Sequence, residues 1–264
     1  MSVEKYFSLE GRVALITGAS GYLGEAMSEA LAEAGAMVYL GGRDIARLEA
    51  LEKRFISAGY RVKALAFDLR DEGKIEDAVH EAGEEAGRLD VLVHNAHRPR
   101  SGAFHASERA DFIEGIELSV VSAHRLLHAA LPYLRQARAR GGSPSVIHIA
   151  SMYGIVSPNP LNYDAPELQN PSFYGASKAA LLQFTRHAAV HLAKESIRVN
   201  ALSPGAFPRP EAPKALVDRL SSQIPLGRVG SPDELKSAIL FLASPSSSYL
   251  TGANLVVDGG YTIV

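Results

Sequence analysis

A glycine-rich turn between a short apolar run and a helical pattern is the feature that most constrains this chain of 264 residues. The run covers positions 13–17, three glycines spaced three residues apart follow it, and the helical pattern extends from Tyr22 to Gly35, which can end a helix. Glycines let the backbone approach a pyrophosphate closely, and the first turn of a helix offers free N–H groups. An ordinary glycine turn is the alternative, but the flanking strand and helix favour a dinucleotide site at Gly18, Ser20, Gly21, Tyr22, Leu23 and Gly24.

The rest of the chain repeats this alternation of short apolar runs and helical patterns, which is typical of βαβ units around a parallel sheet. Strands are predicted at residues 13–17, 37–41, 62–67, 91–94, 146–150, 198–202 and 255–258. Helices are predicted to begin near residues 22, 45, 71, 111, 172, 215 and 232, and one long helical pattern covers 111–138. No repeat or linker divides the chain. We therefore expect a single domain over 1–264, with a doubly wound, Rossmann-like α/β fold of about seven strands.

Polar and glycine residues follow the ends of most of these strands. In a doubly wound sheet, ligands bind beyond the carboxyl ends of the strands. The glycine turn is one such element, and the others are Gly42-Arg43, Asp68, Asn95, Ser151 and Pro204-Gly205. The topology therefore predicts that they converge on one site.

Two residues four positions apart, Tyr174 and Lys178, lie on one face of a predicted helix. An ammonium ion beside a phenol lowers the phenol's pKa, so such a tyrosine can exchange a proton closer to neutral pH. Ser151 ends an apolar run upstream. A pair of this kind alone is more often a solvated helix face of little energetic weight, and its significance comes from the glycine turn that precedes it.

These motifs together resemble the short-chain dehydrogenase/reductase family over nearly all of the chain. Residues 7–13 resemble the family's entry to the first strand, and residues 94–97 its Asn-Asn-Ala-Gly element. Residues 198–205 resemble its Asn-x-x-x-Pro-Gly element, and residues 251–260 its C-terminal strand. The resemblance implies an oxidoreductase that moves a hydride between nicotinamide C4 and a substrate carbon, interconverting a carbonyl and a hydroxyl.

The resemblance also implies a role for each residue of the Ser-Tyr-Lys set. Tyr174 would donate or accept the proton, Ser151 would polarise the substrate oxygen, and Lys178 would hold the ribose and lower the pKa of Tyr174. The family's fourth catalytic residue, usually Asn, aligns with Ser119. His148 should face away from Ser151 in its strand, and we expect a buried structural histidine.

The residues after the second predicted strand bear on the choice of cofactor. A carboxylate there would accept from the ribose 2′-hydroxyl of NAD, but Gly42 stands in its place and Arg43 follows. Because a guanidinium suits a phosphate, NADP(H) is predicted in preference to NAD(H). The alternative is a solvated Arg43, with Asp44 on the ribose. The remaining implied cofactor contacts are Asp68, Leu69, Asn95, Ala96, Tyr174, Lys178, Pro204, Gly205 and Phe207.

Several positions depart from the family pattern. The glycine spacing is that of the family's extended members, which suggests, as an alternative, an epimerase or isomerase that returns the hydride to its substrate. Ser119 replaces Asn, His97 replaces Gly, and Arg209 stands where a Thr is usual. These changes keep open a third reading, a non-catalytic nucleotide-binding protein on this fold. Asp68 has an alternative too, as a helix cap before residues 71–72.

Two proline-rich segments are expected to border the site, a loop at 157–171 and a substrate loop and lid at 206–224. His97, Arg98 and Arg209 lie beyond strand ends or in this lid, and Arg100, His105 and Lys214 lie nearby. They predict a small polar or anionic substrate, such as a sugar derivative or an acid. The alternative is that these charges are solvated or serve a subunit interface.

Composition excludes several other classes of protein. The formal net charge is −2 without a basic block, which argues against nucleic acid as a partner. No apolar run is long enough to cross a bilayer and no signal-peptide pattern begins the chain, so we expect a cytoplasmic protein without a membrane partner. The absence of cysteine excludes disulfides and thiol ligands, and no metal site is predicted. Apolar positions on the helices at 111–138 and 172–194, and the apolar end at 261–264, predict a homotetramer or a homodimer.

Overall fold

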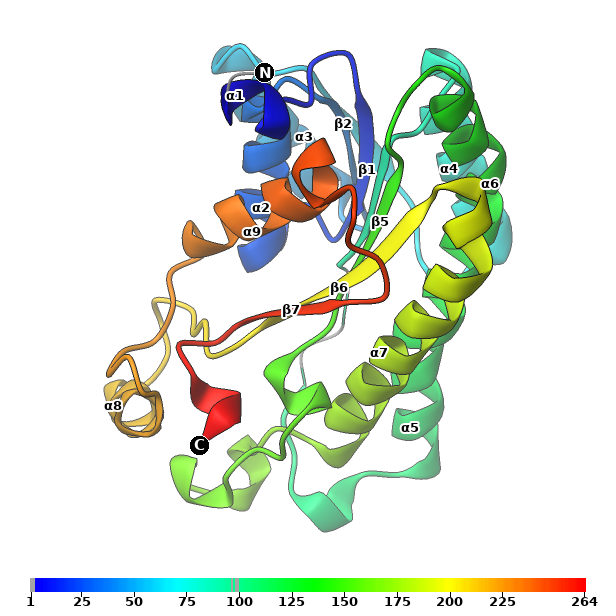
Figure 1. The fold of residues 1–264 in the computed structure, drawn as a ribbon. Helices are drawn as coiled ribbons and strands as arrows, with labels where there is room; N and C mark the ends of the chain where they lie inside the picture. Colours follow the sequence, from blue (N-terminus) through cyan, green and yellow to red (C-terminus); the bar gives the residue numbers. More distant parts are fainter. Residues whose placement is uncertain (1–2, 96, 98–99) are drawn as a thin grey trace.

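The computed structural model describes residues 3–95, 97 and 100–264. Its single sheet has seven parallel strands in the order β3-β2-β1-β4-β5-β6-β7 (Figure 1). All seven predicted strands are confirmed, with bounds that shift by no more than two residues: β1 Val13–Thr17, β2 Met37–Gly42, β3 Val62–Ala66, β4 Val91–His94, β5 Ser145–Ile149, β6 Arg198–Pro204 and β7 Asn254–Val257. The chain reverses its direction of winding between β1 and β4, which is where a doubly wound sheet opens a crevice.

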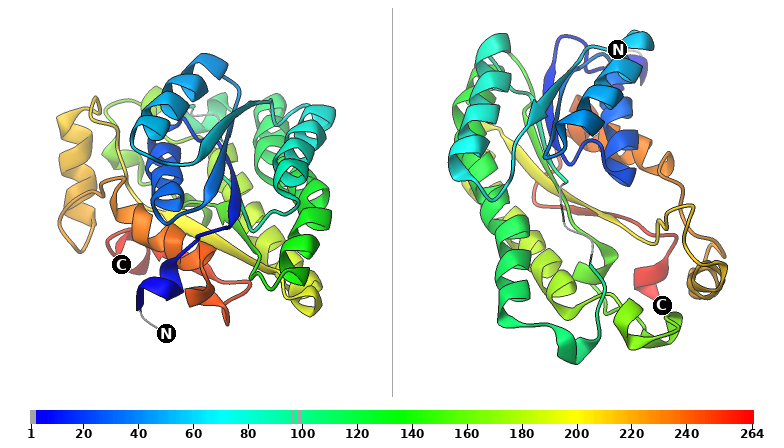
Figure 2. Two further views of the ribbon diagram at one scale, coloured as in Figure 1. Left: turned by 90° about the horizontal axis from the view of Figure 1, so that it is seen from above. Right: turned by 180° about the vertical axis from the view of Figure 1, so that it is seen from behind.

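Helices cover both faces of this sheet (Figures 1 and 2). One face packs against α2 (Tyr22–Glu33), α3 (Ile45–Ser57) and α9 (Glu234–Ala243), and the other against α4 (Glu72–Ala86), α6 (Ser122–Ala139) and α7 (Ser172–Leu192). Because both faces are covered, all residues of β1, β4, β5 and β6 are buried, as expected of parallel strands. The shorter helices are α1 (Val3–Phe7), α5 (Arg109–Ile116) and α8 (Lys214–Gln223).

The long helical pattern at 111–138 is not one uniform α-helix. A π-helical turn at Glu117–Val121 separates α5 from α6. Such a turn widens the helix locally, and π-turns are frequent at functional sites. The hydroxyl of Ser122 donates to the backbone oxygen of Leu118 at 2.7 Å. The widened turn places Ser119 in the interior, where it is 4% exposed.

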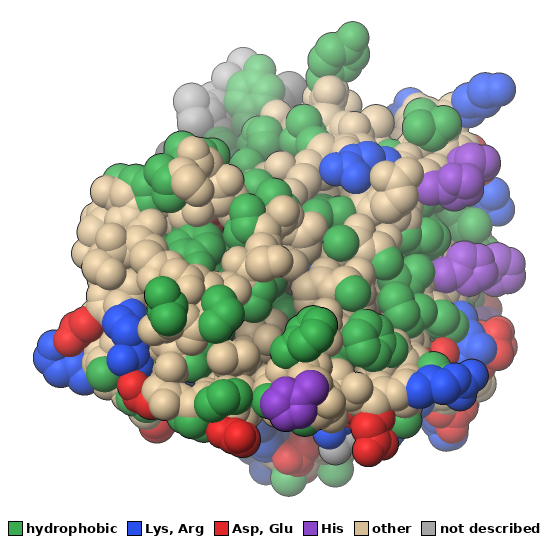
Figure 3. Space-filling model, turned by 90° about the horizontal axis from the view of Figure 1, so that it is seen from below, with side chains coloured by type: hydrophobic (Ala, Val, Ile, Leu, Met, Phe, Trp, Pro, Cys, Tyr) green, Lys and Arg blue, Asp and Glu red, His purple; other side chains and the backbone are tan. Residues whose placement is uncertain are grey.

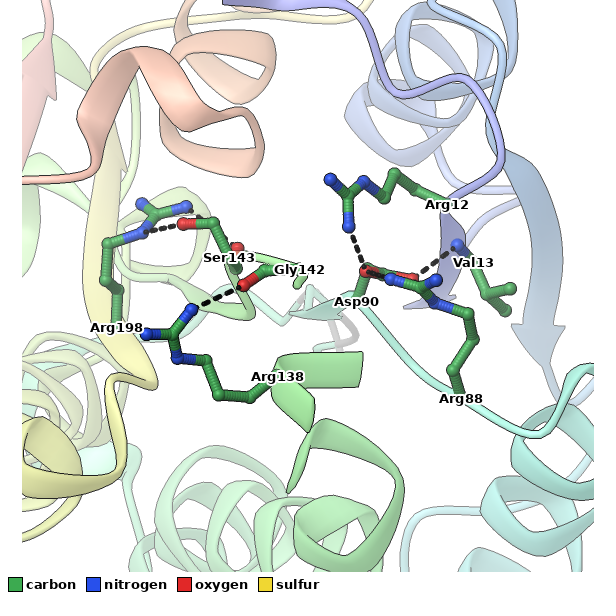
Figure 4. Close-up of polar contacts among 8 residues, drawn as sticks. All are labelled: Arg12, Val13, Arg88, Asp90, Arg138, Gly142, Ser143 and Arg198. Carbon is green, nitrogen blue, oxygen red and sulfur yellow. Dashed lines mark hydrogen bonds and ion pairs between the residues drawn. The ribbon is translucent and has the colours of Figure 1, made fainter. Parts of the chain in front are cut away.

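A polar network fixes the amino ends of the strands, at the edge opposite the carboxyl ends (Figure 4). Asp90, which is 2% exposed, accepts from the backbone N–H of Val13 at 3.1 Å and from the guanidinium groups of Arg12 and Arg88. Arg198, the first residue of β6, donates only to neutral oxygens, among them Leu242 O at 2.9 Å. Burial lowers the pKa of Arg198 to about 10. These contacts join β1 to β4 and β6 to the end of α9, away from the carboxyl edge.

The two proline-rich segments lie together at the carboxyl edge. Within 157–171 the chain forms only short 3₁₀ turns, and within 206–224 it forms α8. Arg219 of α8 donates to Asn162 O at 2.9 Å and pairs with Asp164 at 2.7 Å, which ties α8 to the 157–171 loop. Across the described part of the chain, no helix has both the length and the apolar character that a membrane crossing requires.

Candidate active site

A cleft of about 660 Å³ opens at the carboxyl edge of the sheet, within the size range of small-molecule sites. The predicted convergence of strand ends is observed there. The predicted residues that line the cleft are Gly18, Ser20, Gly21, Tyr22, Leu23, Gly24, Arg43, Asp68, Leu69, Asn95, His97, Ser151, Tyr174, Lys178, Pro204, Gly205, Phe207 and Arg209. Ser119 is not part of this lining, and Ala96 and Arg98 lie outside the described residues.

The glycine turn passes very close to its own helix. Gly18 adopts a left-handed φ of 64°, and a Cβ on Gly24 would lie 2.1 Å from the oxygen of Gly18. In the part of the chain that the structure describes, no side chain caps the first turn of α2, so its N–H groups remain available to an anion. A tight glycine turn and an uncapped helix N-terminus, both facing a cleft of dinucleotide size, fit the diphosphate of a dinucleotide.

Asn95 holds the glycine turn against the end of β4. Its side-chain amide donates to the oxygens of Thr17 and Gly18, both at 3.1 Å, and its backbone N–H donates to the Thr17 hydroxyl at 3.0 Å. The sequence reading placed Asn95 beside the cofactor. The structure adds that its amide hydrogens are used by the turn, so Asn95 also acts by positioning the loop.

Ser151, Tyr174 and Lys178 meet on one wall of the cleft. Ser151 follows β5, and its Oγ accepts from the Tyr153 amide at 3.1 Å, so the hydroxyl hydrogen is not used by that contact and can be donated to Tyr174 or to a ligand. Tyr174 and Lys178 lie one turn apart in α7, with Lys178 Nζ 5.8 Å from the centre of the Tyr174 ring. The Lys178 ammonium donates to Ile149 O at 2.7 Å, and Lys178 is 2% exposed.

The protonation of this group differs from the simple expectation of a phenol acidified by its neighbouring lysine. Desolvation raises the pKa of Tyr174, and a hydrogen bond with Ser151 lowers it by less. Burial also lowers the pKa of Lys178 itself to about 8. The lysine has no carboxylate to offset its burial, and Ile149 O holds its ammonium beside the ring rather than at the phenolic oxygen.

The end of the cleft beside β2 carries two arginines. Arg43 lines the cleft, and so does Arg47, whose guanidinium donates to Ser20 O at 2.7 Å. The carboxylate of Asp44 accepts from the Arg47 amide at 3.2 Å as the N-cap of α3. Asp71, not Asp68, caps α4. Asp68 pairs with Arg70 at 2.6 Å, which lowers the pKa of the Asp68 carboxyl.

The residues predicted to meet the substrate separate into two groups. His97 and Arg209 line the cleft, and the His97 ring lies 5.7 Å from the Tyr174 ring. Desolvation, then the charges of Lys178 and Arg209, lower the pKa of His97 to about 4, so this ring is neutral at pH 7. Arg100 instead pairs with Asp111 and Glu114, and Lys214 pairs with Asp218 at 2.6 Å. These two cations are therefore neutralised locally.

Ser119 lies behind Tyr174 rather than in the main cleft. It lines a cavity of about 20 Å³ together with His97, Tyr174 and Ser177, and its hydroxyl donates to Ser177 Oγ at 3.3 Å. A polar cavity of this volume is large enough for one water molecule.

Three features of the site were missed at the level of sequence. Arg47 lies one helical turn after Arg43, and that i+4 spacing was the available signal. The contact between Tyr22 and Arg209 joins segments far apart in the chain and had no local signal. The buried His94 beneath the site was not singled out either, and its Nδ1 has no hydrogen-bond partner. Within the described ranges, no group of three His, Asp or Glu side chains could hold a metal ion.

Comparisons with known proteins agree with this geometry. Residues 18–262 match the family described as Enoyl-(Acyl carrier protein) reductase. A rhamnolipids biosynthesis 3-oxoacyl-(acyl-carrier-protein) reductase from Pseudomonas aeruginosa is 34% identical over 262 residues, which cover 97% of this chain and 98% of that protein.

Solved structures are similar over the same extent. A gluconate 5-dehydrogenase from Burkholderia cenocepacia, in complex with NADP and tartrate, gives a TM-score of 0.87 at 29% identity over 100% of both chains. A 3-ketoacyl-(acyl-carrier-protein) reductase from Brucella melitensis, complexed with NADH, gives 0.84 at 32% identity over 97% of this chain and 100% of that chain. Since the similarity extends through almost the whole sequence and the fold, the chain belongs to the short-chain dehydrogenase/reductase family of oxidoreductases, which use a nicotinamide cofactor.

Proposed function

We propose that this protein is an NADP(H)-preferring oxidoreductase that interconverts a carbonyl and a hydroxyl on a small polar substrate, with Tyr174 as the acid and base. The observation that carries the proposal is the meeting of Ser151, Tyr174 and Lys178 on the wall of the cleft that begins at the glycine turn. A hydroxyl, a phenol and an ammonium ion beside one another can bind and protonate a substrate oxygen.

Each of the three side chains has a chemical task in this proposal. The cofactor, when bound, supplies or accepts the hydride. The free hydroxyl hydrogen of Ser151 donates to the substrate oxygen and orients it. Tyr174 gives its proton to that oxygen during reduction and takes it back during oxidation. The Lys178 ammonium stabilises the phenolate that reduction leaves behind, and its burial strengthens this interaction.

The preference for NADP(H) rests on charge at the adenine side. Arg43 and Arg47 both line the cleft, and Gly42 leaves the strand end without a carboxylate. Asp44, the alternative partner of the ribose, is engaged as the N-cap of α3. A 2′-phosphate bound at this end of the cleft would have two guanidinium groups nearby. Guanidinium groups can donate two parallel hydrogen bonds to a phosphate.

The proposed substrate class rests on the other end of the cleft, where the polar, neutral ring of His97 lies 5.7 Å from the Tyr174 ring. The relatives act on polar acids such as gluconate, and on 3-oxoacyl groups. Apolar side chains exposed on the face that is seen from below favour 3-oxoacyl groups as the competing substrate class (Figure 3). Of the exposed apolar side chains, Phe104 is 79% and Leu161 81% exposed.

The test is NADPH-dependent reduction of two panels, keto acids of sugars and 3-oxoacyl thioesters, by the wild type and Tyr174→Phe. We expect turnover with the polar panel and a loss of about 10²–10⁴-fold in kcat on removing the phenolic hydroxyl. Tyr249→Phe, a change at a fully exposed tyrosine, is the control and should retain full activity. Equal activity of Tyr174→Phe would contradict the mechanism, and turnover of the thioesters alone would contradict the substrate class. Substrate conversion without net change in NADPH absorbance would indicate an isomerase.

A further inference from the structure

Arg209 lies in the cleft with its guanidinium over an aromatic ring. Its guanidinium carbon lies 5.4 Å from the centre of the Tyr22 ring, a cation–π contact that joins the loop after β6 to the first residue of α2. Arg209 is exposed, and among the described residues no carboxylate pairs with it. A cation without an acidic partner, held over an aromatic ring in a ligand cleft, is available to an anion.

The loop that presents Arg209 is stiff. Pro208 and Pro210 flank it, and the residue before a proline is restricted to extended conformations. Phe207 anchors the loop, because a Cβ on Gly230 would lie 2.5 Å from the Phe207 ring, and the Gly230 amide donates to Ala206 O at 2.9 Å. The backbone of Arg209 is therefore held at the edge of the cleft. Rotation about its side-chain bonds is what can carry the guanidinium toward a ligand.

The anion that belongs beside Tyr22 follows from the helix that begins there. The uncapped N–H groups of the first turn of α2 face the cleft at this point, so a diphosphate at the helix N-terminus lies next to the Tyr22 ring. The other two cleft arginines lie toward the adenine side, and Arg47 is already engaged with Ser20 O. Arg209 is thus the cleft arginine that lies beside the first residue of α2, where a diphosphate would bind.

We propose that Arg209 is a positioning residue for the cofactor. In the free protein its guanidinium rests on the Tyr22 ring, and when a dinucleotide binds, the side chain moves to contact the diphosphate; we call this movement the latch. The proposal deepens the proposed function, because it requires a dinucleotide in the cleft. It assigns two phosphate sites to two different arginines, the diphosphate to Arg209 and the 2′-phosphate to Arg43. The cation–π contact of an exposed guanidinium on a half-buried ring is weak, and a charge-assisted hydrogen bond to a phosphate is stronger, so the movement to the phosphate is favourable.

Calorimetric titration with four ligands separates these assignments. NADPH carries both phosphate groups, NADH and ADP-ribose carry the diphosphate alone, and 2′-AMP carries the 2′-phosphate alone. We expect Arg209→Gln to weaken NADPH, NADH and ADP-ribose by about 10-fold or more and to leave 2′-AMP unchanged. Arg43→Gln should give the complementary pattern, with NADPH and 2′-AMP weakened. Arg186→Gln removes a surface charge on α7, away from the cleft lining, and should change none of the four.

The Tyr22 contact is tested by a double-mutant cycle measured with ADP-ribose. Tyr22→Phe keeps the ring and should bind like the wild type. Tyr22→Leu removes the resting contact, so it should leave ADP-ribose binding as tight or tighter in the wild-type background and unchanged in the Arg209→Gln background, because the ring acts through the guanidinium. An equal loss of affinity in both backgrounds would overturn the latch. Thermal unfolding of each variant confirms that it folds, which is expected because Arg209 is exposed.

The outcomes distinguish this proposal from the proposed function. Binding of ADP-ribose by the wild type with no loss in Arg209→Gln would overturn the latch and leave the oxidoreductase intact. A rise in the KM of a carbonyl substrate in that variant, with unchanged ADP-ribose affinity, would also overturn it and assign Arg209 to the substrate. If the folded wild type bound none of the four ligands, the proposed function would fail together with the latch.

Discussion

Lys178 is buried in an environment very different from water. Burial without a carboxylate partner lowers its pKa to about 8, so the ammonium is present below pH 8 and is lost above it. Reduction in our mechanism requires both that ammonium and a protonated Tyr174. We therefore expect kcat/KM for reduction to fall as the pH rises through about 8, since this parameter reports groups of the free enzyme. A profile that stays flat to pH 10 would contradict the role given to Lys178.

His148 gives a prediction about stability. The structure confirms that it is buried, with Nδ1 2.9 Å from the Thr185 hydroxyl, and burial lowers its pKa to about 3. The unfolded chain therefore binds a proton more readily between pH 6.5 and 3, so the free energy of unfolding falls as the pH drops through this range. The contribution of this one group is about 5 kcal/mol at full effect.

Urea unfolding of His148→Asn and the wild type at pH 7 and pH 4.5 checks this expectation. The variant should lose less stability on acidification than the wild type. His124→Asn, a change at an exposed histidine of α6, should behave like the wild type. Parallel losses in all three proteins would contradict the assignment, even if His148→Asn is less stable at both pH values.

The packing of α4 on α6 depends on the absence of a single side chain. A Cβ on Gly83 would lie 2.3 Å from the Tyr133 ring, whereas a Cβ on Gly73 in the same helix would meet only Asp71 at 3.6 Å. We expect Gly83→Ala to destabilise the fold by about 1–3 kcal/mol through overpacking. Gly73→Ala should be neutral or stabilising by up to about 1 kcal/mol. Chemical denaturation measures both, and a stabilised Gly83→Ala would show that this interface is loose.

Secondary-structure elements could be predicted from the sequence where the pattern of buried apolar residues alone determines their type and bounds. The strands are short, mostly apolar segments, and the glycine turn is local, so both were found within two residues. The π-turn at Glu117–Val121 was not, because one extra residue in a turn hardly changes an apolar pattern. The cations near the site show the same limit. Arg98, Arg100 and Arg209 look alike in sequence, yet Arg100 pairs with Asp111 and Arg209 rests on Tyr22.

On the scale of the whole molecule, several large apolar side chains are exposed to solvent. Ile263 is 83%, Val264 85% and Val190 74% exposed, the last of them on α7. Figure 3 shows apolar side chains spread over the face of the molecule that is seen from below. Exposed apolar side chains on several elements favour association, and we propose a homotetramer, with a homodimer next. Light scattering should give a mass near four times 28.2 kDa. The double variant Ile263→Asp, Val264→Asp should give a smaller assembly, and a monomeric wild type at micromolar concentration would contradict the proposal.

Recognition of the cofactor is the claim on which the other functional statements depend. Calorimetric titration of the purified wild type with NADPH and with NADH tests it most directly. Arg43 and Arg47 line the cleft, and Asp44 is engaged as the N-cap of α3. This arrangement predicts tight binding of NADPH and binding of NADH weaker by about 10-fold or more. Tighter binding of NADH would move ribose recognition to an acidic residue and contradict the role of Arg43. Binding of neither by folded protein would contradict the account of the cleft as a dinucleotide site.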